Sequence, residues 1–337
     1  MTPTFSVLIP TIGREARLER CLWSVRCHQS ELKNGEIEII VASGSGVEDT
    51  WLRELCEKYG AKLVGNPRQD AASGKYVALY HSRGKYVVML DSDNELAYWD
   101  TLSRAAELMD KNSFAILGIE SHYLSNYYMS SLSRYLTVLL HISDPLSWCM
   151  AKQPRIVTSD EIVEVVKFAE YSKSWPLGAN GFIFNREGLL ECCREGRFED
   201  SEVVLNYATR YNKRYWLRIP NRGVCHYVCD NLWHFIKKRR RQTYHYLNMQ
   251  HKGNNVSWTK LGPAMSPWLA VVYCLSIVGP LWHTVLGIIK DKDFAWLWHM
   301  IACPASVFGS AWGFLTWILV DEQQRDLEGW LQPKQTT

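Results

Sequence analysis

The chain has 337 residues, of which 47% are hydrophobic, and a formal net charge of +3 at pH 7. This composition excludes an intrinsically disordered chain, and the length suits one large domain with an appendage, or two domains. The sequence is rich in Trp (15) and Tyr (17), which concentrate where an apolar surface meets water, as at membrane interfaces. The ten cysteines have no regular spacing and no signal peptide opens the sequence, so we expect reduced thiols that face a cytosol.

The first hundred residues alternate short apolar runs with stretches of helical periodicity. We expect strands over residues 5–10, 36–43, 61–65 and 85–90, and helices over residues 13–32, 47–59, 70–82 and 98–110. This alternation predicts an α/β fold, with a mostly parallel sheet flanked by helices. Such sheets bind ligands at the carboxyl ends of their strands.

The next stretch, to residue 230, has weaker signals. We expect strands over residues 114–120 and 215–220, a turn and strand over 176–185, and a strand over 224–228 that ends near His226. Residues 123–150 are aromatic and apolar and predict one or two helices, and a loop leads into a helix over residues 197–210.

Two carboxylates, Asp91 and Asp93, stand directly after the apolar run that ends the strand 85–90. A buried strand end is a costly place for negative charge unless a cation lies there. Residues at positions i and i+2 of an extended chain point to the same side. The pair therefore predicts a site for a divalent cation whose shell is completed by water and a substrate phosphate.

Two long apolar segments near the C-terminus, residues 268–289 and 294–320, contain no Asp, Glu, Lys or Arg. Each exceeds the roughly 20 residues that a membrane span needs, so we expect two membrane helices within residues 263–322. Pro280 and Pro304 predict kinks in them. The alternatives are a re-entrant or interfacial hairpin, and buried core helices of a soluble protein. Two spans would return the tail, residues 323–337, to the side of the main domain. The basic residues near the first apolar segment place that side in the cytosol by the positive-inside tendency.

Five consecutive basic residues, Lys237, Lys238, Arg239, Arg240 and Arg241, lie in a segment of basic and aromatic residues, 231–262, that we expect to be an amphipathic interface segment. Their closeness to an apolar segment favours lipid headgroups, or the phosphate of a donor or acceptor, over nucleic acid.

Several motifs in order, F-S-V-L-I-P-T, the second strand, D-S-D, W-P-L-G-A-N-G, F-E-D-S-E and C-H, resemble those of family 2 glycosyltransferases with the GT-A fold. The resemblance covers roughly residues 4–228 and implies a catalytic domain over residues 1–230. It implies an inverting hexosyl transfer from a nucleotide sugar, with Mn²⁺ or Mg²⁺ as cofactor.

The resemblance also implies roles for individual residues. Asp200 is the candidate general base, with Glu199 as its alternative or supporting neighbour. Asp91, Asp93 and His226 are the candidate metal ligands. The nucleotide side comprises Pro10, Thr11, Arg14, Glu15, Ser43, Asp91 and Asp93, and the acceptor side Gly178, Ala179, Asn180 and Gly181. Without a catalytic role, His226 would be a core histidine, and the two acidic residues would be helix N-terminal acids. A zinc site at Cys225-His226 is not expected, because no second ligand pair has a zinc spacing.

One position departs from the family pattern. Relatives commonly carry an Asp after the second strand that contacts the base, and this chain has Ser43 there. A hydroxyl can still hydrogen-bond a base edge, so we expect UDP first and GDP second.

The acceptor follows from the membrane expectation. We expect a hydroxyl of a lipid-linked saccharide or glycolipid, because that reaction needs a base and the Glu199-Asp200 pair supplies one. The alternative is polyprenyl phosphate itself, whose phosphate is already ionised. Two spans are few for a processive polysaccharide synthase, and a non-catalytic membrane scaffold would not need these acidic residues.

Overall fold

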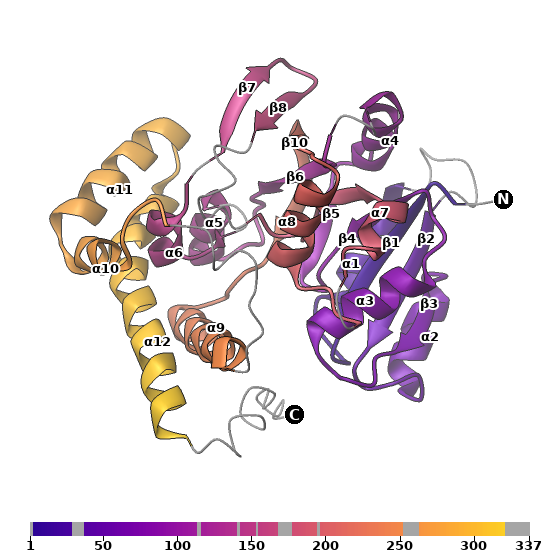
Figure 1. Cartoon of the computed structure of the whole chain (residues 1–337), viewed down its shortest axis with the longest axis horizontal. Helices are drawn as coiled ribbons and strands as arrows, with labels where there is room; N and C mark the ends of the chain where they lie inside the picture. The colour runs from indigo at the N-terminus through magenta and orange to yellow at the C-terminus, as the bar shows by residue number, and fades with distance from the viewer. Residues whose placement is uncertain are drawn as a thin grey trace. The chain divides into compact units, whose positions relative to one another are not determined.

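A computed structural model describes residues 3–28, 37–112, 116–139, 142–152, 154–167, 177–193, 196–251 and 263–320 (Figure 1). The chain divides into two compact units. Among the described residues, the first unit comprises 3–125, 154–167 and 177–226, and the second comprises 126–152 and 227–320. Residues 126–152 thus belong with the C-terminal part of the chain. The end of the expected interface segment, 252–262, and the expected tail, 323–337, lie outside the described residues.

The first unit is built on a mixed sheet in the order β3-β2-β1-β4-β9-β6-β10-β8-β7, with β5 paired to β10. Strands β3, β2, β1 and β4 are parallel, as are β6 and β10, whereas β5, β7, β8 and β9 pair antiparallel. The strands are β1 (Phe5–Thr11), β2 (Ile37–Ser43), β3 (Lys62–Gly65), β4 (Tyr86–Met89), β5 (Asn94–Ala97), β6 (Ile119–Leu124), β7 (Arg155–Ser159), β8 (Glu164–Lys167), β9 (Ile183–Asn185) and β10 (Tyr215–His226).

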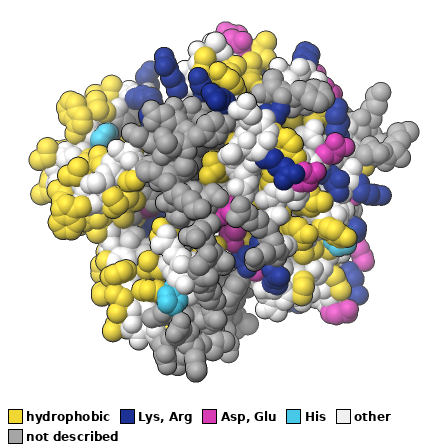
Figure 2. Space-filling view, in the orientation of Figure 1, with side chains coloured by type: hydrophobic (Ala, Val, Ile, Leu, Met, Phe, Trp, Pro, Cys, Tyr) yellow, Lys and Arg dark blue, Asp and Glu magenta, His cyan; other side chains and the backbone are white. Residues whose placement is uncertain are grey.

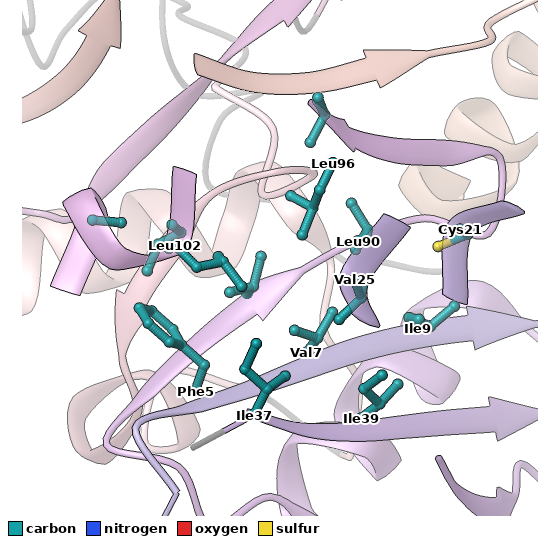
Figure 3. Packing of buried hydrophobic residues seen from close by; sticks show 14 of the residues in the cluster. Phe5, Val7, Ile9, Cys21, Val25, Ile37, Ile39, Leu90, Leu96 and Leu102 are labelled. Atoms are coloured by element: carbon teal, nitrogen blue, oxygen red, sulfur yellow. The ribbon is translucent and has the colours of Figure 1, made fainter. Parts of the chain in front are cut away.

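Helices cover both faces of this sheet, because side chains of a buried strand alternate between its faces. On one face, Phe5, Val7 and Ile9 pack with helices α1 (Leu18–Cys27), α2 (Thr50–Lys58) and α4 (Thr101–Asn112), as Figure 3 shows for part of the cluster. On the other face, Leu8 packs with α3 (Ala71–His81), α7 (Arg186–Leu190) and α8 (Asp200–Arg210). The predicted α/β fold with a mostly parallel sheet is confirmed.

Local signals explain where two of these helices start. Asp49 caps α2 by accepting from Leu52 N at 3.2 Å, and Asp70 caps α3 by accepting from Ser73 N at 2.7 Å. Both helices begin at the carboxyl ends of strands, β2 and β3. The caps therefore help to fix the loops that border the site described below.

The second unit is helical. Its elements are α5 (Ser131–Val138), α6 (Pro145–Met150), α9 (Leu232–His251), α10 (Pro267–Leu275), α11 (Val278–Asp291), a 3₁₀ helix (Phe294–Trp298) and α12 (His299–Leu319). Among the described helices, the run Phe294–Leu319 is long and apolar enough to cross a membrane. Helices α10 and α11 reach such a length only as a pair, and the pair is bent by 78°.

The bend replaces the single helix expected over residues 268–289. Pro280 lies in the first turn of α11, where its missing N–H is not needed. Its ring would clash with the carbonyl of Ser276, four residues earlier, if the helix were continuous. Helix α10 accordingly ends at Leu275, and Ser276 caps it.

Candidate active site

The two aspartates of the D-S-D motif lie in a turn between β4 and β5. The N–H of Asn94 donates to the carbonyl oxygen of Asp91 at 3.0 Å and closes this turn. Asp91 Oδ1 lies 3.0 Å from Lys75 Nζ, whereas Asp93 Oδ2 lies 3.7 Å from His226 Nε2. The expectation that both carboxylates point to one side of an extended chain is wrong, because the chain turns at Ser92.

Lys75 connects the D-S-D turn to the candidate base. Its Nζ donates to both carboxylate oxygens of Asp200, at 2.8 and 2.7 Å, in addition to its contact with Asp91. The side chain of Lys75 is only 6% exposed. Burial lowers the pKa of Lys75, but the carboxylates of Asp200 and Asp91 outweigh it and raise that pKa well above its usual value. The ammonium therefore stays charged at neutral pH.

Sequence reasoning missed Lys75, although a signal was present. Lys75, Ala78 and Leu79 share one face of α3 at helical spacing, and all three are buried. A lysine within a buried apolar face needs carboxylate partners, because an unpaired buried charge is costly. A buried lysine in the helix that precedes a D-x-D strand therefore indicates that the carboxylates of that motif are candidate partners.

Asp200 and Glu199 have different environments, which separates the two candidate bases. Asp200 opens α8 and faces Lys75, whereas Glu199 Oε1 accepts from Arg197 Nη2 at 2.9 Å. Burial raises the pKa of Asp200, Lys75 counteracts this, and the charge of Asp91 adds to the rise. A carboxylate whose pKa is raised is a better proton acceptor at neutral pH. The geometry therefore favours Asp200 over Glu199.

His226 ends β10, next to the turn that holds Asp93. Its ring meets Tyr123 edge-on at 5.3 Å, and its buried Nδ1 has no hydrogen-bond partner. A separation of 3.7 Å between His226 Nε2 and Asp93 Oδ2 allows both atoms to bind one ion at ordinary ligand distances of about 2.1 Å. Among the described residues no group of three His, Cys, Asp or Glu is arranged to hold a metal. Asp93 and His226 lie close enough to share one ion, whereas the third expected ligand, Asp91, is paired with Lys75.

The nucleotide-side residues at the end of β1 are linked to the D-S-D turn through Glu15. Its Oε1 accepts from Thr11 Oγ1 at 2.8 Å and from Ile12 N at 3.1 Å, and its Oε2 accepts from Ser92 Oγ. Pro10 and Thr11 are buried. Glu15 therefore orders the loop after β1 against the turn that carries the carboxylates.

Ser43 and Arg14, also expected on the nucleotide side, border the loops after β2 and β1. Ser43 is fully buried, and its Oγ lies 2.9 Å from Ser45 Oγ and accepts from Ser45 N at 3.1 Å. Arg14 is largely exposed, with its Nε 3.5 Å from Asp49 Oδ1. The hydroxyl pair of Ser43 and Ser45 occupies the position where relatives are expected to carry a carboxylate.

Of the four expected acceptor-side residues, Gly178 to Gly181, Asn180 contacts the D-S-D turn. Asn180 Oδ1 accepts from Asp91 N at 3.1 Å and from Asn94 Nδ2 at 2.5 Å. Ala179, Asn180 and Gly181 are buried, and Gly178 is half-buried. The Asn180 side chain therefore positions the turn that carries Asp91 and Asp93.

Gly181 has a conformation that only glycine adopts readily. Its φ is +72°, and a Cβ there would lie 3.0 Å from Ser121 Cβ and 3.1 Å from Val224 Cγ2. We expect Gly181→Ala to lower the free energy of unfolding by about 2–3 kcal/mol, from backbone strain and crowding together. Urea unfolding of the first unit measures this. Gly46→Ala is the matched control, because Gly46 has φ +83° but open space around its Cβ. Equal losses in the two variants would contradict the crowding argument.

The five basic residues of α9 differ in environment. Arg239 is buried, with its Nη1 3.6 Å from Asp144 Oδ2, so the expected headgroup contact does not hold for it. Arg240 lies 4.9 Å over the Trp312 ring, and Lys238 Nζ donates to Val228 O at 3.3 Å. Lys237 and Arg241 are exposed.

Comparisons with known proteins agree with this fold. The profile of the family Glycosyl transferase family 2 matches residues 6–165. The mannosyltransferase PcManGT from Pyrobaculum calidifontis, solved with GDP-Man and Mn²⁺, is 16% identical, with a TM-score of 0.52 over 94% of this chain and 88% of that one. S. aureus TarS 1-349 is 14% identical, with a TM-score of 0.44 over 96% of this chain and 91% of that one. Among curated proteins, none matches the sequence.

Proposed function

Because the profile of family 2 glycosyltransferases matches residues 6–165, we propose that this chain is a glycosyltransferase of that family. We propose that it transfers a sugar from a nucleotide sugar to a hydroxyl of a lipid-linked saccharide or glycolipid. We propose further that the reaction inverts the anomeric centre and takes place at the cytosolic face of a membrane. The acceptor part of the proposal depends on one observation, the position of the Asp200 carboxylate beside the D-S-D turn, where Lys75 contacts both Asp200 and Asp91.

Asp200 is suited to accept a proton. The acceptor hydroxyl attacks C1 of the donor sugar, its proton passes to Asp200, and the bond from C1 to the diphosphate oxygen breaks. The raised pKa of Asp200, caused by burial, favours this proton transfer. Lys75 keeps Asp200 in reach of the D-S-D turn, because the same ammonium contacts Asp91. An acceptor that is already an ionised phosphate would not need this base.

A divalent cation, Mn²⁺ or Mg²⁺, would be held by Asp93 and His226. Such a cation offsets the negative charge of a diphosphate leaving group. Asp91 remains paired with Lys75, which brings a second positive charge to the same turn. Asn180 supports the position of Asp91 from behind by accepting from its backbone N–H.

We propose UDP as the nucleotide, with GDP as the second choice. Ser43 is fully buried and hydrogen-bonded to the exposed Ser45, so we infer that the Ser45 hydroxyl offers a donor and an acceptor to a base edge, and the end of β1 is ordered by Glu15. Release of nucleoside diphosphate from UDP-sugars and GDP-sugars with Mn²⁺ or Mg²⁺ tests the donor. A non-catalytic scaffold would release no nucleoside diphosphate, even when the correct nucleotide sugar is among those supplied.

Asp93→Asn is expected to weaken Mn²⁺ binding about 100-fold, because it removes a charged ligand. Loss of a residue that only hydrogen-bonds a metal ligand already lowers metal affinity by roughly 10–100-fold. Electron paramagnetic resonance of free Mn²⁺ measures the dissociation constant without requiring turnover. Asp110→Asn is the control, because Asp110 is exposed and pairs with Lys85 in the same unit. Unchanged Mn²⁺ affinity in Asp93→Asn would exclude this residue as a ligand.

A second candidate is a polyprenyl-phosphate monosaccharide synthase. One observation favours it: both oxygens of Asp200 already accept from Lys75, which opposes their use as a base. The two candidates differ in their dependence on Asp200, because an ionised phosphate acceptor needs no base.

A further inference from the structure

We propose that the second unit binds a phospholipid bilayer from one side only. In this arrangement α10 and α11 enter and leave the same leaflet, and α12 lies along the interface, so that none of these helices crosses the membrane. The inference is independent of the proposed reaction. It corresponds to the re-entrant or interfacial hairpin, the alternative to the two spans expected from the sequence.

Helices α10 and α11 are individually too short to cross. At about 1.5 Å per residue, the 9 residues of α10 and the 14 residues of α11 extend roughly 14 and 21 Å, against a hydrocarbon core of about 30 Å. The 78° bend keeps the two helices from forming one straight rod. The pair has the dimensions of a hairpin within one leaflet.

Part of the backbone at the bend is hydrogen-bonded locally, which lowers the cost of a helix break within hydrocarbon. Ser276 Oγ donates to Tyr273 O at 2.8 Å and accepts from Gly279 N at 3.2 Å. The hydroxyl of Tyr273 donates to Gly279 O at 3.3 Å. These bonds pair the carbonyl of Tyr273 and both backbone polar groups of Gly279, on the two sides of the break.

Polarity along the pair also fits a hairpin whose apex is inserted. Ile277 and Val278 at the bend are 72% and 78% exposed. The charged stretch 290–293 follows the far end of α11, and the exposed Trp268 lies at the start of α10. Trp and charged residues suit the headgroup region, and apolar residues suit the acyl chains. Both ends of the pair thus belong at one surface, with the bend beneath it.

The beginning of α12 is attached to a polar helix. Asp293 Oδ1 lies 2.5 Å from Arg134 Nη2, and Trp298 Nε1 donates to Ser131 Oγ at 2.8 Å. Arg134 and Ser131 belong to α5, which contains three other hydroxyl or phenol side chains in eight residues and follows β6 after six residues of chain. If residues 291–298 lay on the far side of the membrane, α5 would have to lie there too. Moving its arginine through the hydrocarbon core carries a high free-energy cost.

The end of α12 is attached to the basic helix α9. Gly309 and Gly313 let the two backbones approach closely: a Cβ at Gly309 would lie 2.9 Å from Ile236 O, and one at Gly313 2.4 Å from Arg240 O. Arg240 Nε also donates to Thr316 Oγ1 at 3.3 Å. A span that carried this end to the far side would draw Arg240 and its basic neighbours into hydrocarbon. With both ends held by charged elements, α12 fits a position along the interface.

The face left exposed is apolar and continuous along these helices. Figure 2 shows hydrophobic side chains gathered over α10, α11 and α12. The large apolar residues that are at least 42% exposed are Trp268, Leu269, Val272, Leu275, Ile277, Val278, Leu281, Trp282, Val285, Leu286, Ile289, Phe294, Leu297, Ile301, Phe308, Phe314, Leu315, Ile318 and Leu319. So large a patch marks an interaction surface. The exposed Lys237, Arg241, Lys290 and Lys292 favour a leaflet with anionic headgroups as its partner.

Cysteine labelling tests the topology. Native Cys27, exposed in the first unit, reports the side of the catalytic domain. Two reporters are added in separate variants of the full chain, Lys290→Cys and a cysteine appended after Thr337. Sealed membrane vesicles of both orientations are treated with an impermeant maleimide, and labelled peptides are quantified by mass spectrometry. The proposal expects both reporters to be labelled in the same vesicles as Cys27. Lys290→Cys labelled only in the opposite vesicles requires that the α10–α11 pair crosses the membrane, an appended cysteine labelled only there requires an odd number of spans, and either overturns the proposal.

Vesicle flotation tests the partner. The double variant Ile277→Glu/Val278→Glu places charge at the exposed apex, and we expect at least a tenfold loss of binding to phosphatidylcholine–phosphatidylglycerol vesicles. Tyr80→Glu, at a residue 62% exposed in the first unit, is the control and should bind as the unaltered chain does. Flotation that is unchanged in the double variant, while self-association in detergent is lost, would assign the apolar face to a second copy of the chain and overturn the proposal.

Discussion

Asp200→Asn is expected to reduce kcat for transfer to a hydroxyl acceptor by about 10²–10⁴-fold, the usual contribution of a general base. Asn keeps the shape of the side chain and can still contact Lys75, but it cannot take the proton. KM for the nucleotide sugar should change little, because Asp200 acts on the acceptor. Steady-state kinetics at saturating donor measures the effect.

The pH dependence of the unaltered enzyme supplies an independent readout. Burial raises the pKa of Asp200 above its usual value, with Lys75 counteracting and Asp91 adding to the rise. The base must be deprotonated, so kcat should fall as the pH decreases through this raised pKa, and the fall should be absent in Asp200→Asn. Glu199→Gln is the matched control, because Glu199 pairs with Arg197 and should retain both kcat and the acid limb. An acid limb that persists in Asp200→Asn would assign the titration to another group.

Lys75→Met is expected to have the second large effect, a loss in kcat/KM on the order of 10²-fold or more. The substitution removes the positive charge between Asp91 and Asp200 and leaves the two carboxylates facing each other. Breaking the pair should also destabilise the first unit by about 2–3 kcal/mol, below the full value for a buried ion pair because both carboxylates are about one-third exposed. Kinetics and urea unfolding give the two quantities.

A double-mutant cycle separates the ion pair from simple packing. In Lys75→Met/Asp200→Asn no buried charge remains between these two positions, so much of the lost stability should return, with a coupling of about 1–3 kcal/mol. Activity should not return, because the base is still missing. Additive losses of stability would show that Lys75 acts through its packing and not through Asp200.

The sequence predicted those parts of the fold that have strong periodicity. The strands β1 to β4 and the helices between them were predicted within a few residues, because buried parallel strands are uniformly apolar and their helices begin at caps such as Asp49 and Asp70. The short strand β5 and the β7–β8 hairpin were missed. Strand β5 has four residues directly after a turn, and all five residues of β7 are exposed, so neither has an apolar run.

The site was predicted less completely, because it depends on distances between side chains that are far apart in the sequence. The family resemblance implied that Asp91, Asp93 and His226 share one site; Asp93 and His226 lie 3.7 Å apart. It could not indicate that Asp91 pairs with Lys75, since that contact depends on the turn at Ser92 and on the side of α3 that faces it. Nor could it show that Asn180 supports the turn, or that Arg239 is buried against Asp144. Pro280 predicted a kink in this segment, but the angle between α10 and α11 depends on the packing of the second unit.

Nucleoside diphosphate release by the purified full chain in detergent with Mn²⁺, with and without polyprenyl phosphate, tests whether Asp200 acts as the base for a hydroxyl acceptor. UDP-sugars and GDP-sugars are supplied to the unaltered chain and to Asp200→Asn side by side. We predict metal-dependent release that Asp200→Asn abolishes and polyprenyl phosphate does not stimulate. Release that polyprenyl phosphate stimulates and that Asp200→Asn leaves intact would contradict this prediction and identify a lipid-phosphate sugar synthase.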